Sequence, residues 1–205
     1  MNVYVETNFL CEIAFSQEES RACKEVLALG ESGQLQLFVP AFSLIEAGLA
    51  LETRLLQQHR LQPELDRLFR EGRRSAIAGE SFTLLETQLV ALLATTQENH
   101  VAVLNTVRKQ LLAHAKIIST TQDTVNAAIE LEARFALSAG DAIVLASVLS
   151  DMSGSDRTES CFLNKNSKDF ADPEIVRKLN DRSCKVISSF DAGCNYLVAK
   201  IHAKP

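Results

Sequence analysis

The chain has 205 residues, of which 46% are hydrophobic and 23% are charged, and its formal net charge is -5. This length and apolar content suffice for one sizeable core, or for one domain with a large insertion. The negative charge argues against a strongly basic nucleic-acid coat protein, but it leaves open a nucleic-acid enzyme whose acidic site holds cations. No apolar run approaches the ~18 residues of a membrane helix and no signal peptide is visible, so we expect no membrane association and a cytoplasmic location.

The cysteines are odd in number and include no Cys-x-x-Cys pair: Cys11, Cys23, Cys161, Cys184 and Cys194. We therefore predict reduced, mostly buried thiols rather than a disulfide framework. The four histidines are scattered without the spacing of a zinc site, and we expect none of them to be catalytic.

The first sixty residues alternate short apolar strands with helices. Thr7 can cap the first helix, and the sequence Ser-Gln-Glu-Glu over 16–19 is a capping-box pattern that predicts the start of the second. The expected elements in chain order are a strand over 3–5, helices over 9–15 and from 16–19 to 30–33, a strand over 35–39 and a helix from 41 to about 58.

Residues 60–118 have apolar positions at helical spacing and no strand pattern, with Pro63, Gly72 and Gly79 as the breakers. They predict two or three amphipathic helices, of which a long hairpin is one arrangement. The insertion would cover the site, mediate dimerisation or bind a partner, and its simplest interpretation is extra helices packed on the sheet. We expect its apolar faces to be buried against the core or another subunit, because so many exposed leucines would cause aggregation.

The closing third returns to alternating elements. In chain order we expect a helix over 121–135, a core helix over 142–152, a polar loop over 152–159, a strand over 161–163, a helix over 173–180, a strand over 184–187 and a helix over 190–202. Strands alternating with helices imply a parallel sheet covered on both faces. The predicted fold class is therefore a three-layer α/β/α domain over 1–205, with about 4–5 short strands and a helical insertion over 60–118.

Four polar side chains stand where these strands and helices begin or end: Glu6, Glu46, Asp141 and Asn166. Glu6 directly follows the first strand and Asn166 follows the strand over 161–163. Sites in parallel sheets lie beyond the carboxyl ends of the strands. A metal-dependent nuclease needs several carboxylates at such an edge, because phosphodiester hydrolysis adds negative charge to an anionic substrate.

The segments that contain these residues resemble the PIN-domain family of metal-dependent ribonucleases, which includes the toxins of toxin–antitoxin pairs. They cover residues 3–10, 39–46, 137–146 and 162–170. Two positions depart from the family pattern. Glu6 stands where Asp is usual, and Asn166 stands where the fourth acid would be Asp, with Asp169 three residues further on.

The resemblance implies a PIN-like fold and an endoribonuclease, a hydrolase that cleaves single-stranded RNA with water activated by Mg²⁺ or Mn²⁺. It assigns metal ligation to Glu6, Glu46 and Asp141, with Asn166 or Asp169 orienting the water or a second cation. Besides RNA, it leaves an antitoxin protein and a homodimer open as partners.

Three further polar residues are candidates for substrate contacts. Lys165 and Lys168 flank Asn166 and would contact RNA phosphates, unless they are solvated loop lysines. Thr7 would bind a ligand or a phosphate, unless it is a plain helix cap. Glu12 would reach the acidic cluster, but a solvent-facing position is favoured. Arg70, Arg73 and Arg74 are better explained as helix-surface charges than as phosphate contacts.

Two alternative functions compete with the nuclease. A degenerate PIN domain would bind RNA or a protein partner without cleavage, and the residues at positions 6 and 166 favour it. A phosphatase-like hydrolase is disfavoured, because its nucleophile would be an Asp after the first strand, where the chain has Glu6.

Overall fold

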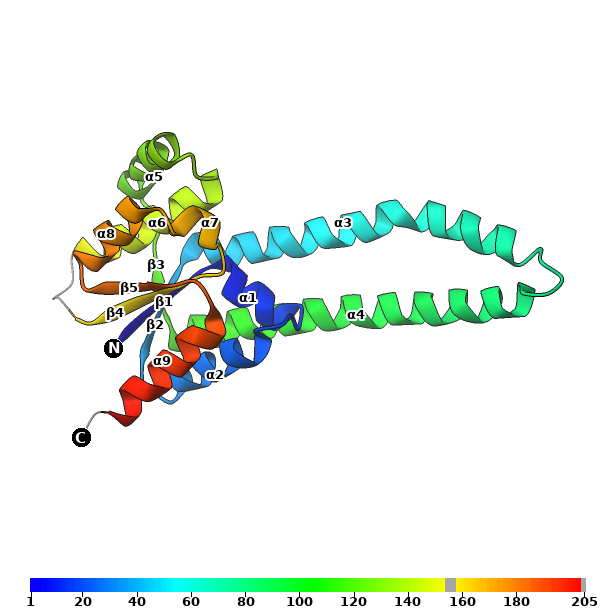
Figure 1. Cartoon of the computed structure of the whole chain (residues 1–205), viewed down its shortest axis with the longest axis horizontal. Coiled ribbons are helices and arrows are strands. Elements are labelled where there is room, and N and C mark those ends of the chain that lie inside the picture. Colours follow the sequence, from blue (N-terminus) through cyan, green and yellow to red (C-terminus); the bar gives the residue numbers. More distant parts are fainter. Residues whose placement is uncertain (154–157, 204–205) are drawn as a thin grey trace.

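The computed structural model describes residues 1–153 and 158–203 (Figure 1). Within them, five parallel strands form one sheet in the order β3-β2-β1-β4-β5. The strands are β1 (Asn2–Val5), β2 (Gln36–Pro40), β3 (Lys116–Ile118), β4 (Ser160–Leu163) and β5 (Cys184–Ile187). Val3 of β1 pairs with Leu37 of β2 and with Cys161 of β4.

Both faces of the sheet are buried, which explains why its strands read as continuous apolar runs. Successive side chains of a strand point to opposite faces. Accordingly, Val3 and Val5 belong to one core cluster, whereas Tyr4 between them belongs to the other. Burial on both sides leaves the strand ends as the places where polar side chains can gather.

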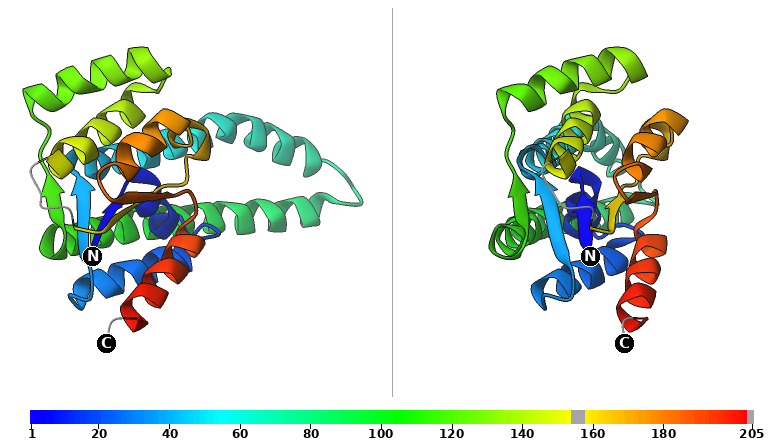
Figure 2. Two further views of the ribbon diagram at one scale, coloured as in Figure 1. Left: turned by 60° about the vertical axis from the view of Figure 1, so that its left-hand side comes forward. Right: turned by 90° about the vertical axis from the view of Figure 1, so that its left-hand side faces the viewer.

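Helices form a layer on each face of the sheet (Figure 2). One core cluster contains residues of α1 (Thr7–Ala14), α2 (Ser20–Glu31), α9 (Phe190–His202) and the sheet-proximal part of α4 (Gly79–His114). The other contains residues of α5 (Gln122–Phe135), α6 (Ala139–Ser153), α7 (Ser167–Phe170) and α8 (Pro173–Asn180). The predicted three-layer α/β/α class is therefore confirmed, while the domain boundaries stay a prediction.

Helices α3 (Ala41–Gly72) and α4 form a long antiparallel hairpin that projects beyond the sheet (Figure 1). The expected end of α3 near residue 58 is wrong, because the helix continues through Pro63. Pro63 is exposed, so water can satisfy the carbonyl that loses its helical partner. The expected lack of strands in this region is also wrong, since β3 follows α4 at the edge of the sheet.

The insertion buries its apolar faces on the α/β core only in its inner part, where Leu104, Val107 and Leu111 belong to the core, and that prediction is wrong for the outer part. In the outer part of the hairpin, large apolar side chains are more than half exposed: Leu56, Leu61, Leu68, Leu84, Leu85, Val90 and Leu92. For these outer residues, only burial against another subunit remains of that expectation.

Two predicted helix caps are also wrong. Glu6, not Thr7, caps α1, because its side chain accepts a hydrogen bond from the Asn8 backbone N–H. The capping box at 16–19 does not form: Ser16 has a left-handed backbone with φ of 50°, and Glu19 makes no side-chain cap to α2.

All five cysteines are free and buried, as expected. The predicted loop over 152–159 includes residues 154–157, which lie outside the described residues, and its first two residues are helical. Among the helices that the structure describes, none is long and apolar enough to cross a membrane.

Candidate active site at the carboxyl edge of the sheet

The strand order changes direction between β1 and β4. From β1 the chain moves outward through β2 to β3, and then returns to place β4 on the other side of β1. In parallel sheets, ligands bind in the crevice beyond the carboxyl ends at such a switch point. Glu6 directly follows β1 and Asn164 directly follows β4, so both stand at this crevice.

Glu6 is buried at the crevice, with only 4% of its surface exposed. Its Oε2 accepts a hydrogen bond from the backbone N–H of Asn8 at 2.7 Å, and its Oε1 accepts one from the backbone N–H of Lys165 at 3.4 Å. Burial raises the pKa of the Glu6 carboxyl from 4.5 to about 7, although both N–H groups oppose the rise. The nearby charges of Asp141 and Glu46 raise it further.

Glu46, on the second turn of α3, is held between two other elements. Its Oε2 accepts a hydrogen bond from Oγ1 of Thr7 at the start of α1. Its Oε1 lies so close to Gly140 of α6 that a Cβ at that position would collide with it. Glycine at 140 is therefore required for Glu46 to keep its place.

Asp141, in the first turn of α6, is held by Ser138 just before that helix and by Asn166 in the loop after β4. Its Oδ2 accepts a hydrogen bond from Ser138 Oγ at 2.5 Å, and the backbone N–H of Asp141 donates to that Ser138 Oγ at 3.1 Å. Asn166 Nδ2 donates to Asp141 Oδ1 at 3.2 Å. The structure thus brings Asn166 to Asp141, as the sequence predicted.

The three carboxylates repel one another. Asp141 raises the pKa of both Glu6 and Glu46, although burial is the larger cause for each. Among the described residues, no Lys or Arg side chain forms an ion pair with any of the three. A negative cluster without a cationic partner attracts cations.

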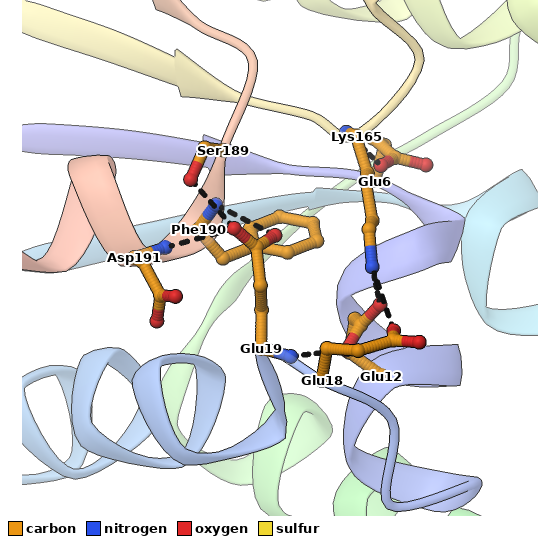
Figure 3. Close-up of polar contacts among 8 residues, drawn as sticks. All are labelled: Glu6, Glu12, Glu18, Glu19, Lys165, Ser189, Phe190 and Asp191. Carbon is orange, nitrogen blue, oxygen red and sulfur yellow. Dashed lines mark hydrogen bonds and ion pairs between the residues drawn. The ribbon is translucent and has the colours of Figure 1, made fainter.

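Lys165 is positioned differently from the prediction. Its backbone faces Glu6, but its side chain runs to α1 and the turn after it, where the ammonium forms ion pairs with Glu12 and Glu18 (Figure 3). Glu12 is fully buried, so its predicted solvent-facing position is wrong. Because the Lys165 ammonium is paired with these two acids, it does not face the three carboxylates as a phosphate contact would.

Glu19, at the start of α2, connects the same region to α9 by hydrogen bonds. Glu19 accepts hydrogen bonds from Ser189 Oγ at 2.6 Å and from the Phe190 N–H at 3.1 Å, at the start of α9 (Figure 3). The N–H of Glu19 donates to Glu12 at 2.9 Å. The turn between α1 and α2, the loop after β4 and the start of α9 are therefore held together by one polar network beside the site.

Asn164 is a site residue that the sequence analysis missed. It is fully buried, and neither Oδ1 nor Nδ2 has a hydrogen-bond partner among the described residues. An unpaired buried amide costs roughly 1–3 kcal/mol, so such a group calls for an explanation. The pattern that identified Glu6 could also have identified Asn164, since Asn164 is the first residue after a buried strand.

Asp169 and Lys168 lie on α7, beyond the loop that carries Asn166. No hydrogen bond or ion pair among the described residues links Asp169 to the three carboxylates. Lys168 is exposed on the same helix. Phe170 closes this segment by packing edge-on against Phe162 of β4, with ring centroids 5.2 Å apart.

The sequence matches the family profile described as a PIN domain over residues 3–170. The chain belongs to the PIN-domain family. The match includes every segment that carries the carboxylates, and it gives the chain a nuclease-type fold. No curated protein matches the sequence.

PIN domains generally use divalent metals, and the donors at this site fit a hard divalent cation in kind. Carboxylate oxygens and an amide oxygen are the ligands that Mg²⁺ and Mn²⁺ prefer. In the part of the chain that the structure describes, no three acidic, His or Cys side chains already converge as a ligand group. Glu46 and Asp141 are instead turned to Thr7 and Ser138.

Proposed function

We propose that this PIN-domain protein is a divalent-metal-dependent endoribonuclease that cleaves single-stranded RNA. One observation supports it most: Glu6 after β1, Glu46 on α3 and Asp141 on α6 lie near enough to one another at the switch point for Asp141 to raise the pKa of the other two, and none of them has a cationic partner among the described residues. Keeping such a cluster ionised is costly, and a metal ion relieves that cost. A structural role alone does not explain why three elements each direct an acid to one crevice.

Each residue has a distinct role in this proposal. Glu6, Glu46 and Asp141 would hold Mg²⁺ or Mn²⁺, which would neutralise the scissile phosphate and lower the pKa of a bound water. Thr7 and Ser138 orient Glu46 and Asp141 through their hydroxyl groups. Asn166 and the unpaired amide of Asn164 provide donors for the attacking water or a phosphate oxygen.

The test is cleavage of an unstructured RNA by the purified protein with Mn²⁺. We expect cutting that stops with EDTA, and at least a 100-fold loss of rate in Glu46→Gln and in Asp141→Asn. Asp169→Asn is the matched control, because that acid has no described contact with the cluster. Cutting in EDTA, or wild-type rates in both active-site variants, would contradict the proposal.

A second candidate is a PIN domain that binds RNA or a protein partner, such as an antitoxin, without cleavage. The amide of Asn166 favours it, because an amide carries no charge and here donates to Asp141 instead of joining the acids. On this reading, the wild type binds RNA but does not cut it. Asn166→Asp would then tighten Mn²⁺ binding, since a charged ligand attracts a divalent ion more strongly.

A further inference from the structure

Four of the leucines that are more than half exposed in the outer half of the α3–α4 hairpin form two pairs, one on each helix. The exposed fractions are 55% for Leu61, 54% for Leu68, 54% for Leu85 and 63% for Leu92. The two leucines on each helix are seven residues apart, which is two helical turns, so each pair lies on one face of its helix. We call these four residues the leucine face.

The leucine face lies on one side of the hairpin. Leu65 on α3 and Leu89 on α4 are half-buried, and each lies one turn from both leucines of its own helix. In an antiparallel pair, equivalent flanks of the two helices face the same side. A groove of about 620 Å³, lined by residues of both helices such as His59, Val90 and Gln97, includes none of the four leucines.

We propose that the leucine face packs against the leucine face of a second copy of this chain, so that two hairpins form an intermolecular four-helix bundle. A two-fold dimer brings the same patch of both copies together, so the patch must be self-complementary. The leucine face is, because its positions and the seam residues Leu65 and Leu89 are apolar. Arg54 stands seven residues before Leu61 on the same face of α3, so the apolar face ends there. Its guanidinium lies over the Phe15 ring, 4.9 Å from the ring centroid.

The area of the hairpin suits a dimer of moderate affinity. The outer eighteen or so residues of each helix are about 27 Å long, and two helices side by side are about 20 Å wide. Two such faces bury roughly 1,000 Å² in total, which is about the lower limit for a specific interface. Four leucines from each copy form the apolar centre that such an interface requires.

Light scattering after size exclusion, with the full chain from about 1 to 200 μM, tests the proposal. The wild type should be a dimer at the upper end and dissociate on dilution. Leu85→Glu should weaken the dimer at least 30-fold, because it places a charge at the centre of the interface. Val90→Glu is the matched control: Val90 is similarly exposed at 57%, but it lines the groove, which includes none of the four leucines.

Circular dichroism of each variant establishes that the helices remain folded, and Leu68→Glu repeats the test from α3. A monomeric wild type at 200 μM would overturn the proposal and leave the face to a different protein. A dimer that persists in both Leu68→Glu and Leu85→Glu would also overturn it, because the contact would then lie elsewhere. Equal weakening by Val90→Glu and Leu85→Glu would overturn it as well, because the effect would not depend on this face. None of these outcomes depends on nuclease activity.

Discussion

Replacing Glu6 with Gln tests how strongly the site resists a negative charge. Burial raises the pKa of Glu6 from 4.5 to about 7 in the folded protein. The stability that the neutral carboxyl contributes is therefore complete below pH 4.5 and is lost as the pH rises to 7. Each tenfold change in proton affinity is worth about 1.4 kcal/mol, so the wild type should lose about 3 kcal/mol over this window relative to Glu6→Gln.

Urea unfolding in EDTA at pH 4.5, 6, 7 and 8 measures the difference in free energy of unfolding between the two proteins. The Gln side chain also loses one acceptor for an N–H donor, but that cost is the same at every pH and cancels from the slope. The difference should change by about 3 kcal/mol up to pH 7 and then stay level. A constant difference would refute the conclusion that Glu6 is held neutral by burial and by the neighbouring acids.

Three further predictions follow from the same contacts. Gly140→Ala should displace Glu46 and at least halve the Mn²⁺-induced rise in melting temperature, and an unchanged rise would contradict the collision. The net loss of stability should stay below about 2 kcal/mol, because alanine favours the helix while the clash opposes it. Lys165→Met should cost about 2–3 kcal/mol in urea unfolding, because it leaves the buried Glu12 charge without its partner, whereas Lys168→Met should change stability by less than about 0.5 kcal/mol. Mn²⁺ affinity, measured by calorimetry, should rise with pH up to about 7 and then level off, because the cation competes with the proton on the Glu6 carboxyl. An affinity independent of pH would contradict this.

The sequence predicted the sheet correctly, and it pointed to the candidate site, because both inferences depend on local patterns. Short apolar runs between helical segments identify β1, β2, β4 and β5, and polar residues directly after β1 and β4 mark the crevice. β3 was missed, because three residues at a sheet edge are too few to show a pattern. The change of strand order between β1 and β4 explains why Glu6 and Lys165, 159 positions apart in the sequence, are hydrogen-bonded.

Contacts between distant segments could not be predicted. Glu19 is in a capping-box pattern, yet its carboxylate bonds to α9, because the tertiary contact overrides the local one. Glu12 is buried because Lys165, more than 150 residues away, supplies its partner. The exposure of the hairpin leucines could not be predicted for the same reason, because helical periodicity shows that a face is apolar but not what covers it.

Titration calorimetry with Mn²⁺ at pH 7.5 tests most directly whether the three carboxylates form one cation site. Wild type and Asp169→Asn should bind with the same affinity, while Asp141→Asn and Glu46→Gln should each weaken binding at least tenfold, because each removes one unit of charge from the cluster. Equal affinities in all four proteins, or no binding by the wild type, would contradict the account.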